Sequence, residues 1–382
     1  MTAAIASSAI RTCLGDGEKT FEALLRGASG IGPLTEFDER WNLLGGYEIR
    51  DPAPDQASFR ASTWLSECAR DALAQAGVDS ERERVIAIVG TGLRELRELE
   101  RWSEAGGGLE TERLHFAGAV RDAAPGIDEV ITLSNACSAG GHALALAQDL
   151  IELGEADAVL AAGADTMTAS MLAMIGRVSE IPAERVQPFD AARGGALLGE
   201  GAAAIVVVAD GNGNGNGMSR RPLARLLATG MSCDAHHETA ADGGGIARAV
   251  TDAFARAGRR PGEVDLVIAH GTGTAINDPL ESELLAETFG RGSRAPLVTA
   301  VKGALGHTSG AAALMSVDVA LRCLAQAAVP PIVGLSRRIP EAVGLPLVTT
   351  HWGLAELEVV QVNAFGFGGV NAVTLLEAIR EY

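Results

Sequence analysis

The sequence predicts an α/β fold assembled from two similar halves. Short apolar runs of strand length alternate with longer segments of helical periodicity along most of the 382 residues. Glycine is abundant, at 47 residues, and aromatic residues make up only 4%, which is typical of close helix–sheet packing and not of a disordered chain or a coiled coil. We therefore expect a largely parallel sheet with helices on both faces.

Repeated segments indicate the two halves. The helical segment at 71–77 is echoed at 252–258, and the strand before Gly90-Thr91-Gly92 is echoed by the strand before Gly271-Thr272-Gly273 at the same spacing along the chain. Chance similarity in an alanine-rich sequence is the alternative to an internal duplication. A Gly-Asn tract near the middle of the chain is typical of a flexible connector. The predicted division is a first half over 1–210, a linker over 211–221 and a second half over 222–382.

The expected elements follow from periodicity and from turn residues. Gly77 ends the helix that precedes it, and dense alternating charge predicts that the helix over Arg94–Trp102 is exposed. In order, the expected elements are a strand over Ala3–Ile10, a helix over Thr20–Leu25, a loop over Gly27–Trp41, a helix over Ser62–Ala76, a strand over Val85–Val89, a helix over Arg94–Trp102, and strands over Glu129–Leu133, Ala158–Ala162, Ala203–Val208, Leu266–Ala269 and Leu297–Ala300.

Charge and cysteine usage exclude several classes of function. The formal net charge of −18 disfavours general binding to nucleic acid or to an anionic membrane. No apolar run reaches membrane-spanning length, and the chain starts without a signal-peptide pattern. The five cysteines, at positions 13, 68, 137, 233 and 323, show no paired spacing, which favours a reducing compartment and predicts a cytoplasmic protein.

The sequence predicts neither a metal nor a cofactor. The most metal-like cluster runs from Cys233 to Glu238 and includes adjacent histidines, but its spacing matches no common zinc site. The two Gly-Thr-Gly turns do not continue into a dinucleotide-binding fingerprint, and no phosphate-binding Walker loop is present.

Cys137 lies where the strand over Glu129–Leu133 turns sharply into a helix of small residues. A thiol at a helix N-terminus feels the positive end of the helix dipole and unpaired backbone amides, which favour the thiolate and could bind an oxyanion. A small apolar core residue is the alternative, because free cysteines are often buried. From this stretch alone both interpretations stay open.

The second half carries three further loops with chemical content. His270 ends a strand beside a glycine-rich turn, a position typical of active-site residues in α/β sheets but also of buried core histidines. Lys302 lies five residues before His307, at the strand-to-helix position that Cys137 occupies in the first half. Only two of the 31 basic residues are lysines, which suggests that a compact ammonium is needed at position 302. A third loop, at 363–369, is rich in glycine.

Together these motifs resemble the β-ketoacyl-(acyl-carrier-protein) synthases of the thiolase superfamily, and most closely the synthase II type and the ketosynthases of polyketide assembly. The matching segments, in chain order, are Asn-Ala-Cys-Ser-Ala-Gly, Gly-Glu-Gly-Ala-Ala, His-Gly-Thr-Gly-Thr with Asn-Asp, Lys-x-x-x-Gly-His, and Asn-Ala-Phe-Gly-Phe-Gly-Gly-x-Asn. The resemblance spans nearly the whole chain. It implies a duplicated thiolase-like fold with five layers, α-β-α-β-α.

The resemblance also implies a decarboxylative Claisen condensation. Cys137 would carry an acyl thioester, and His270 and His307 would stabilise the enolate formed from a malonyl thioester, with Lys302 tuning the pair. The backbone amides of Cys137 and Phe367 would form the oxyanion hole, and the Phe367 ring would gate the site. The implied substrate-binding residues are Thr272, Thr274, Phe365, Gly368 and Ala196. The implied partners are an acyl carrier protein or acyl-CoA and a second subunit, identical or related.

Some features depart from the family pattern or leave alternatives. Ser316 stands where fatty-acid synthases of this type carry a glutamate, and Ala196 where a phenylalanine is frequent. The chain is also shorter than usual before Ser62, and the Gly-Asn tract is not a family feature. Two other functions stay open: an acyltransferase that delivers the acyl group to an amine or alcohol, and a non-catalytic subunit of a ketosynthase pair. For docking of a carrier protein we expect an arginine patch that includes Arg256, Arg259 and Arg260.

Overall fold

The computed structural model describes residues 2–35, 37, 45–50, 58–178, 183–211, 221–293, 295–353 and 356–379. The 212–220 part of the expected linker lies outside them, so the predicted boundaries between the halves stay a prediction. The strands are β1 (Ala3–Thr12), β2 (Gly15–Asp16), β3 (Val85–Gly90), β4 (Glu129–Leu133), β5 (Ala158–Asp165), β6 (Gly201–Ala209), β7 (Ala224–Cys233), β8 (Leu266–Ile268), β9 (Leu297–Thr299), β10 (Ala328–Val329), β11 (Trp352–Gly353), β12 (Val359–Gly366) and β13 (Val370–Ala378).

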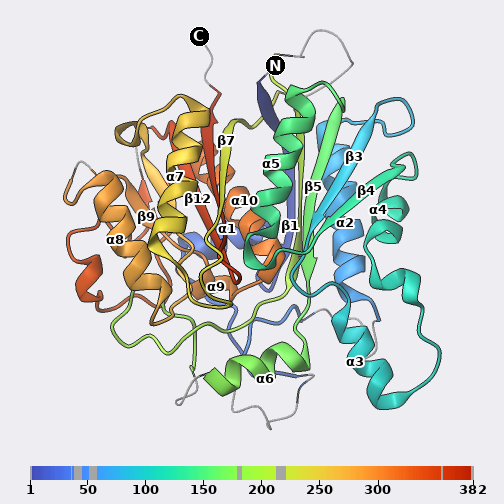
Figure 1. Cartoon of the computed structure of the whole chain (residues 1–382), viewed down its shortest axis with the longest axis horizontal. Coiled ribbons are helices and arrows are strands. Elements are labelled where there is room, and N and C mark those ends of the chain that lie inside the picture. Colours follow the sequence, from blue (N-terminus) through green and yellow to red (C-terminus); the bar gives the residue numbers. More distant parts are fainter. Residues whose placement is uncertain are drawn as a thin grey trace.

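Along the chain, helices alternate with these strands, and in space they cover the faces of the sheet (Figure 1). The α-helices are α1 (Gly17–Leu25), α2 (Arg60–Ala76), α3 (Leu96–Ala105), α4 (Ala117–Ala123), α5 (Ala139–Glu152), α6 (Ala169–Val178), α7 (Gly243–Ala257), α8 (Asn277–Phe289), α9 (Lys302–Leu305) and α10 (Ala312–Gln326). Two short 3-10 turns, η3 (Ala136–Ser138) and η5 (Ser309–Ala311), lead directly into α5 and α10. As expected, Gly77 ends α2, in the left-handed conformation that glycine adopts without strain.

The order of the strands is symmetric about the junction of β1 and β7. From the centre outwards, the first half runs β1-β6-β5-β3-β4 and the second half runs β7-β13-β12-β8-β9. In both halves the first two pairings are antiparallel and the last two are parallel. The duplicated fold is therefore confirmed.

The expectation of a largely parallel sheet is wrong. Only the three outer strands of each half are parallel to one another. β12 and β13 are joined by the three-residue turn 367–369, and a connection that short can join only antiparallel neighbours. In the first half, β6 pairs antiparallel with both of its neighbours, β1 and β5.

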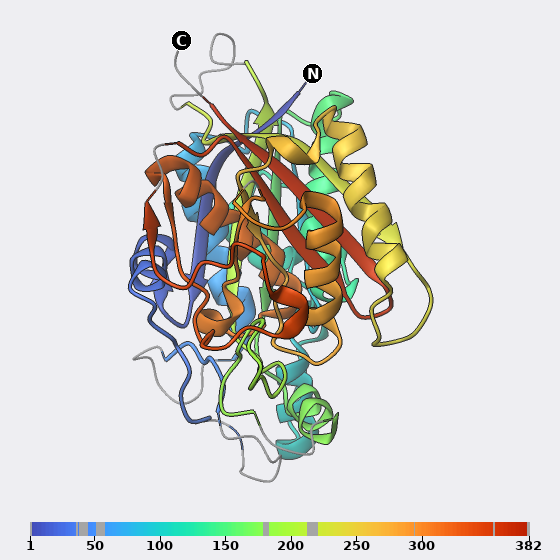
Figure 2. The same ribbon diagram turned by 90° about the vertical axis from the view of Figure 1, so that its left-hand side faces the viewer.

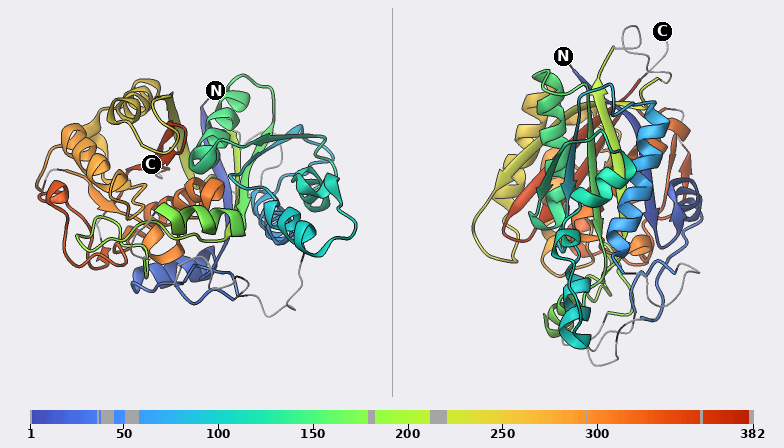
Figure 3. Two further views of the ribbon diagram at one scale, coloured as in Figure 1. Left: turned by 60° about the horizontal axis from the view of Figure 1, so that its bottom comes forward. Right: turned by 90° about the vertical axis from the view of Figure 1, so that its right-hand side faces the viewer.

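The helices divide into three layers around the two halves of the sheet. In Figure 1, α7 and α8 cover the second half on the left, α2 and α4 cover the first half on the right, and α5 and α10 lie between them. The right panel of Figure 3 shows the α2 side. Alternate residues of β5 enter different cores: Val159 and Ala161 face α5 and α10, and Leu160 and Ala162 face α2. This arrangement is the five-layer α-β-α-β-α fold.

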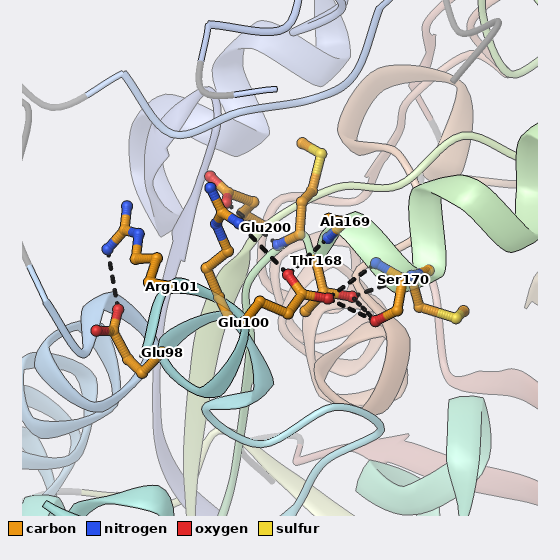
Figure 4. A network of polar contacts seen from close by, with 10 residues as sticks. Glu98, Glu100, Arg101, Thr168, Ala169, Ser170 and Glu200 are labelled. Atoms are coloured by element: carbon orange, nitrogen blue, oxygen red, sulfur yellow. Dashed lines mark hydrogen bonds and ion pairs between the residues drawn. The ribbon is translucent and has the colours of Figure 1, made fainter. Parts of the chain in front are cut away.

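Helix α3 differs from the exposed helix that its charge pattern predicts. It begins at Leu96, after Arg94 takes a left-handed backbone conformation, and the side chains of Glu95 and Glu98 are buried. Figure 4 shows that Glu98 pairs with Arg101 and that Glu100 faces the first backbone amides of α6. Figure 2 shows α6 at the end of the molecule opposite the termini. Glu100 thus joins α3 to a neighbouring helix, other charges of α3 pair within the helix, and its last turn faces water.

Candidate active site

Cys137 is the middle residue of the turn η3, two residues before the start of α5, and is half-buried. The preceding residue, Ala136, has φ +55°, in the left-handed region that costs about 1–2 kcal/mol for a residue with a side chain. Close packing holds this turn, because a Cβ at Gly90 would lie 2.6 Å from the carbonyl carbon of Ala139. The sharp strand-to-helix turn predicted at Cys137 is present.

The electrostatics of the thiol differ from the expectation of a stabilised thiolate. Burial raises the pKa of Cys137 to about 11, although the Lys302 cation and the backbone N–H of Phe367 act to lower it. Loss of hydration therefore outweighs the amides and the cation, and the resting residue is a thiol at neutral pH. The backbone N–H groups of Cys137 and Phe367, the two predicted for the oxyanion hole, both lie close enough to the sulfur to lower its pKa.

His270 is buried just beyond the end of β8. Its Nδ1 accepts a hydrogen bond from the backbone N–H of Phe365 at 3.3 Å, and Lys302 Nζ lies 3.3 Å from the same nitrogen. Two donors facing Nδ1 place the ring proton on Nε2. The Phe365 ring packs against the imidazole, with 5.4 Å between ring centroids. The free Nε2–H is thus a fixed hydrogen-bond donor.

The second imidazole, His307, lies close to the first. The ring centroids of His270 and His307 are 5.5 Å apart and the rings are nearly perpendicular. The backbone of His307 is fixed on one side, because its N–H donates to Leu197 O at 2.9 Å and its carbonyl accepts from Gly199 N at 3.0 Å. Burial, and then the Lys302 charge, lower the pKa of His307 to about 3, and the pKa of His270 is also well below its usual value. Both rings are neutral at pH 7.

Lys302, the first residue of α9, is the cation of the site. Its side chain is buried and donates to the carbonyl oxygen of His270. Burial lowers its pKa to about 8, opposed by the carboxylates of Glu281 and Asp278 and, where it is ionised, by Cys137. The ammonium is therefore mostly charged at pH 7, and it acts on the thiol and on both histidines.

The predicted equivalence between the Lys302 loop and the Cys137 turn is wrong in detail. The turn that corresponds to η3 is η5, which also leads into a long buried helix, and Ser309 in η5 has φ +50° as Ala136 has φ +55° in η3. The position equivalent to Cys137 is therefore Gly310. Lys302 belongs to α9, a short helix between β9 and η5 that the first half does not contain at this point.

Two buried carboxylates of α8 belong to the site without having been assigned to it from the sequence, although Asp278 lies in the Asn-Asp part of a matched motif. Glu281 accepts from the backbone N–H of His270 at 2.7 Å, from that of Gly271 at 2.8 Å and from Asn363 Nδ2 at 3.0 Å. Asp278 accepts from Phe189 N at 2.7 Å and from Gly273 N at 3.1 Å, and burial raises its pKa to about 6. A pair of acids one helical turn apart, directly after a Gly-rich turn, is the signal that could have found them.

The residues predicted to bind substrate lie in the segments next to the two histidines and in the Phe367 turn. Thr272 and Thr274 share a hydrogen bond at 2.9 Å, and Ala196 directly precedes the 197–199 segment that holds His307. Phe367 is 45% exposed at the tip of the turn between β12 and β13, where Gly368 has φ +82°. The side chain of Ser316 is buried in α10.

The loop after β7 packs on the Phe367 turn. Gly368 N donates to the backbone oxygen of Glu238 at 2.8 Å, and Asp234 N donates to Gly369 O at 3.0 Å. Within the part of the chain that the structure describes, no group of three or more metal-binding side chains is gathered. The loop at 234–238 thus contacts the 367–369 turn through its backbone.

The expected arginine patch is not near this centre. Arg259 pairs with Glu377 and Glu263, and Arg256 pairs with Asp149. Glu377 lies near the end of β13 that is opposite the Phe367 turn, which is roughly 25 Å of strand away. Arg260, whose side chain is 86% exposed, pairs with Glu263, so all three arginines form ion pairs at the far end of the sheet.

The small residues after Cys137 serve close packing. A Cβ at Gly140 would lie 2.8 Å from the Gly310 carbonyl oxygen, and one at Gly141 would lie 2.6 Å from Ala372 Cβ. Helix α5 is thus pressed against η5 on one side and against β13 on another. None of the described helices combines the length and the apolar character needed to cross a bilayer.

Comparisons with known proteins give a consistent result. The model for the β-ketoacyl synthase N-terminal domain matches residues 2–210, and the model for the C-terminal domain matches residues 223–336. The chain is 29% identical to a 3-oxoacyl-(acyl-carrier-protein) synthase 2 from Coxiella burnetii, with 94% of each chain covered.

Solved structures agree. The structure described as the ishigamide ketosynthase/chain length factor is similar at a TM-score of 0.90 and 28% identity, over 99% of each chain. A complex described as a type II PKS acyl-carrier protein with its ketosynthase bound to the hexaketide shares the fold, at a TM-score of 0.85 and 19% identity, over 99% of each chain.

Proposed function

The chain belongs to the β-ketoacyl synthase family, whose members act in fatty-acid or polyketide biosynthesis, and we propose that Cys137, His270, His307 and Lys302 carry out a decarboxylative Claisen condensation. The observation that supports this most is a pair of buried, neutral imidazoles beside a buried lysine and a thiol. A neutral imidazole can donate a hydrogen bond to a developing enolate without delivering a full proton to it.

The first step is acylation of Cys137. Its sulfur attacks the carbonyl carbon of an acyl thioester, a new carbon–sulfur bond forms, and the carrier leaves as a thiol that takes up the proton lost by Cys137. With a pKa of about 11 the thiol is a weak nucleophile, so this step needs the nearby Lys302 charge and the two amides. The same N–H groups, those of Cys137 and Phe367, stabilise the oxyanion of the tetrahedral intermediate.

The second step is loss of carbon dioxide from a malonyl-type thioester. The bond to the carboxylate breaks and its electron pair forms an enolate, whose oxygen accepts hydrogen bonds from the imidazoles of His270 and His307. The enolate carbon attacks the Cys137 thioester, a carbon–carbon bond forms, and the Cys137 sulfur leaves and is reprotonated. Phe365 N–H keeps the His270 proton on Nε2, the nitrogen that is free to donate.

An acyl carrier protein is the proposed partner, as a free protein or one specific to a pathway. The complex named above joins such a protein to a ketosynthase of the same fold. We also propose that the chain forms a pair with an identical or related subunit, since a similar structure is described as a ketosynthase/chain length factor. The free cysteines support a cytoplasmic location.

Release of carbon dioxide from malonyl-carrier protein tests the proposal. Wild-type protein loaded with an acyl group should release carbon dioxide and form a β-ketoacyl product, and His307→Ala should do neither. His351→Ala is the matched control, because His351 is exposed. Acyl transfer to an amine or alcohol without release of carbon dioxide would instead identify an acyltransferase, and a wild-type protein that never becomes acylated would identify a non-catalytic subunit.

A further inference from the structure

Asp165, the last residue of β5, is a buried carboxylate that joins three segments of the chain. It accepts hydrogen bonds from Thr91 Oγ1 at 2.6 Å, from Gly92 N at 3.0 Å, from Leu93 N at 2.8 Å and from Gly310 N at 2.7 Å. Its side chain is 1% exposed. The first three donors follow β3 in the first half, and the fourth belongs to η5 in the second half.

The Gly310 bond places this carboxylate at the junction between nucleophile and imidazole. Gly310 follows His307 by three residues and lies in the turn that packs beside η3. It is wedged there, because a Cβ at Gly310 would lie 2.4 Å from Thr91 Cα and one at Gly140 would lie 2.8 Å from Gly310 O. Asp165 therefore ties the chain after His307 to the loop that supports the start of α5.

We propose that Asp165 is a positioning residue that fixes His307 relative to Cys137 during condensation. The inference rests on the proposed function. His307 is held from one side by the 197–199 segment, and Asp165 holds the chain beyond it from the other, across the strained residue Ser309. Without this contact, η5 can shift relative to η3, and the imidazole shifts with it.

The chemistry of the four partners requires an ionised carboxylate. Three of the four are backbone N–H groups, which can only donate, so a protonated acid or an amide would place an N–H or O–H against one of these donors. Burial raises the pKa of Asp165 to about 6, which leaves it charged at neutral pH. That charge also raises the pKa of Cys137. A buried charge that disfavours the thiolate of the nucleophile is explained if its bonds are needed for geometry.

Asp165→Asn separates the two half-reactions. We expect self-acylation of Cys137 within about threefold of wild type, because it does not use His307, and condensation reduced by about 100-fold, because misplacement by about 1 Å has that effect on a reacting group. Thr91→Val removes one donor and should reduce condensation by about tenfold. Asp157→Asn is the matched control, since Asp157 binds the Arg84 backbone N–H at the opposite end of β5.

The pH profile provides a second readout. For wild type, the ratio of condensation to acylation should fall as pH drops through about 6, where Asp165 becomes protonated. In Asp165→Asn that fall should be smaller, and the part that remains belongs to Asp278, whose pKa is also raised to about 6. A loss of fold alone would change both half-reactions together and would not change the ratio between them in this pH range.

The outcomes are distinct. Condensation by Asp165→Asn at the wild-type rate, or a parallel loss of both half-reactions in Asp165→Asn and Thr91→Val, overturns the inference. If Asp165→Asn does not fold, the ratio measured for Thr91→Val decides in the same way. Absence of carbon dioxide release by wild type contradicts the proposed function itself, whatever the variants do.

Discussion

The two halves of the molecule share one architecture but divide the chemistry. Each half places a 3-10 turn with a left-handed residue before a long buried helix, at Ala136 in the first half and at Ser309 in the second. The next residue is Cys137 in one turn and Gly310 in the other. The first half has a thiol at this position. The second half has a glycine there, and its imidazoles and lysine come from neighbouring segments.

Duplication therefore supplies the scaffold of this molecule but not the residues of its site. Gly310 has no space for a side chain, because the Thr91 backbone occupies the position of its Cβ. A second nucleophile at the equivalent place would separate the halves, so the asymmetry is required by packing. Chemistry specific to the second half is instead carried by α9 and by the residues after β8.

The largest expected effect is the loss of stability when Gly310 is given a side chain. Gly310→Ala places a methyl group 2.4 Å from Thr91 Cα, and the backbone must move to accept it. We expect destabilisation by about 3 kcal/mol, at the upper end for overpacking. Cys137→Ala at the equivalent place should change stability by less than about 1 kcal/mol, since the thiol is only half-buried. Urea unfolding of both variants measures the difference; equal stabilities would show that the turns are not distinguished by packing.

Removing the cation of the second half should weaken the nucleophile of the first. Lys302→Met removes a charge that lowers the pKa of Cys137, so the pKa should rise and alkylation by iodoacetamide at pH 8 should slow by about tenfold. The same change should raise the pKa of both histidines, because the ammonium lowers them now.

The chain offers a control in its only other lysine. Lys19 forms an exposed pair with Asp16 at 3.1 Å, with 73% of the lysine side chain accessible. Lys19→Met should leave alkylation unchanged and alter stability by less than about 0.5 kcal/mol. Equal alkylation rates for Lys302→Met and wild type would remove Lys302 from the account of the site.

The pH dependence of alkylation tests whether burial outweighs the helix terminus and the cation in setting the pKa of Cys137. In a Cys233→Ser background, which removes the exposed thiol, the rate at Cys137 should rise from pH 7 to pH 10 without a plateau, because the thiol pKa is raised to about 11. The rise should become less than tenfold per pH unit above about pH 8, where Lys302 loses the charge that lowers the pKa of Cys137. A plateau below pH 8 would mean that the helix terminus and the cation outweigh burial after all. Mass spectrometry of the labelled peptide follows the reaction.

Much of this site could be predicted from the sequence, because its residues sit in local motifs. Cys137 lies at a strand-to-helix turn and His270 at a strand end, and both signals are contained in a few neighbouring residues. The direction of the Cys137 pKa shift could not be predicted in this way. It depends on how much water the whole fold removes from the thiol, and no short stretch of sequence carries that quantity.

Other features depended on contacts between distant segments. The charges of α3 predict exposure only if nothing covers them, yet Glu100 binds the backbone of residues 169 and 170. Glu281 likewise acts on the turn at His270 and on Asn363, from a later strand. The antiparallel strands were missed because an alternation of strands and helices does not specify the direction in which a strand enters the sheet.

The central claim is that the first half supplies the nucleophile and the second half supplies the imidazoles that condensation needs. It is tested most directly by intact-mass measurement through one cycle. Wild type and His307→Ala are loaded with an acyl group from its carrier protein and then given malonyl-carrier protein. The account predicts that both gain the acyl mass on Cys137 and that only wild type loses it, with release of carbon dioxide. Discharge of the acyl group by His307→Ala at the wild-type rate, or acylation of a Cys137→Ala variant, would contradict the account.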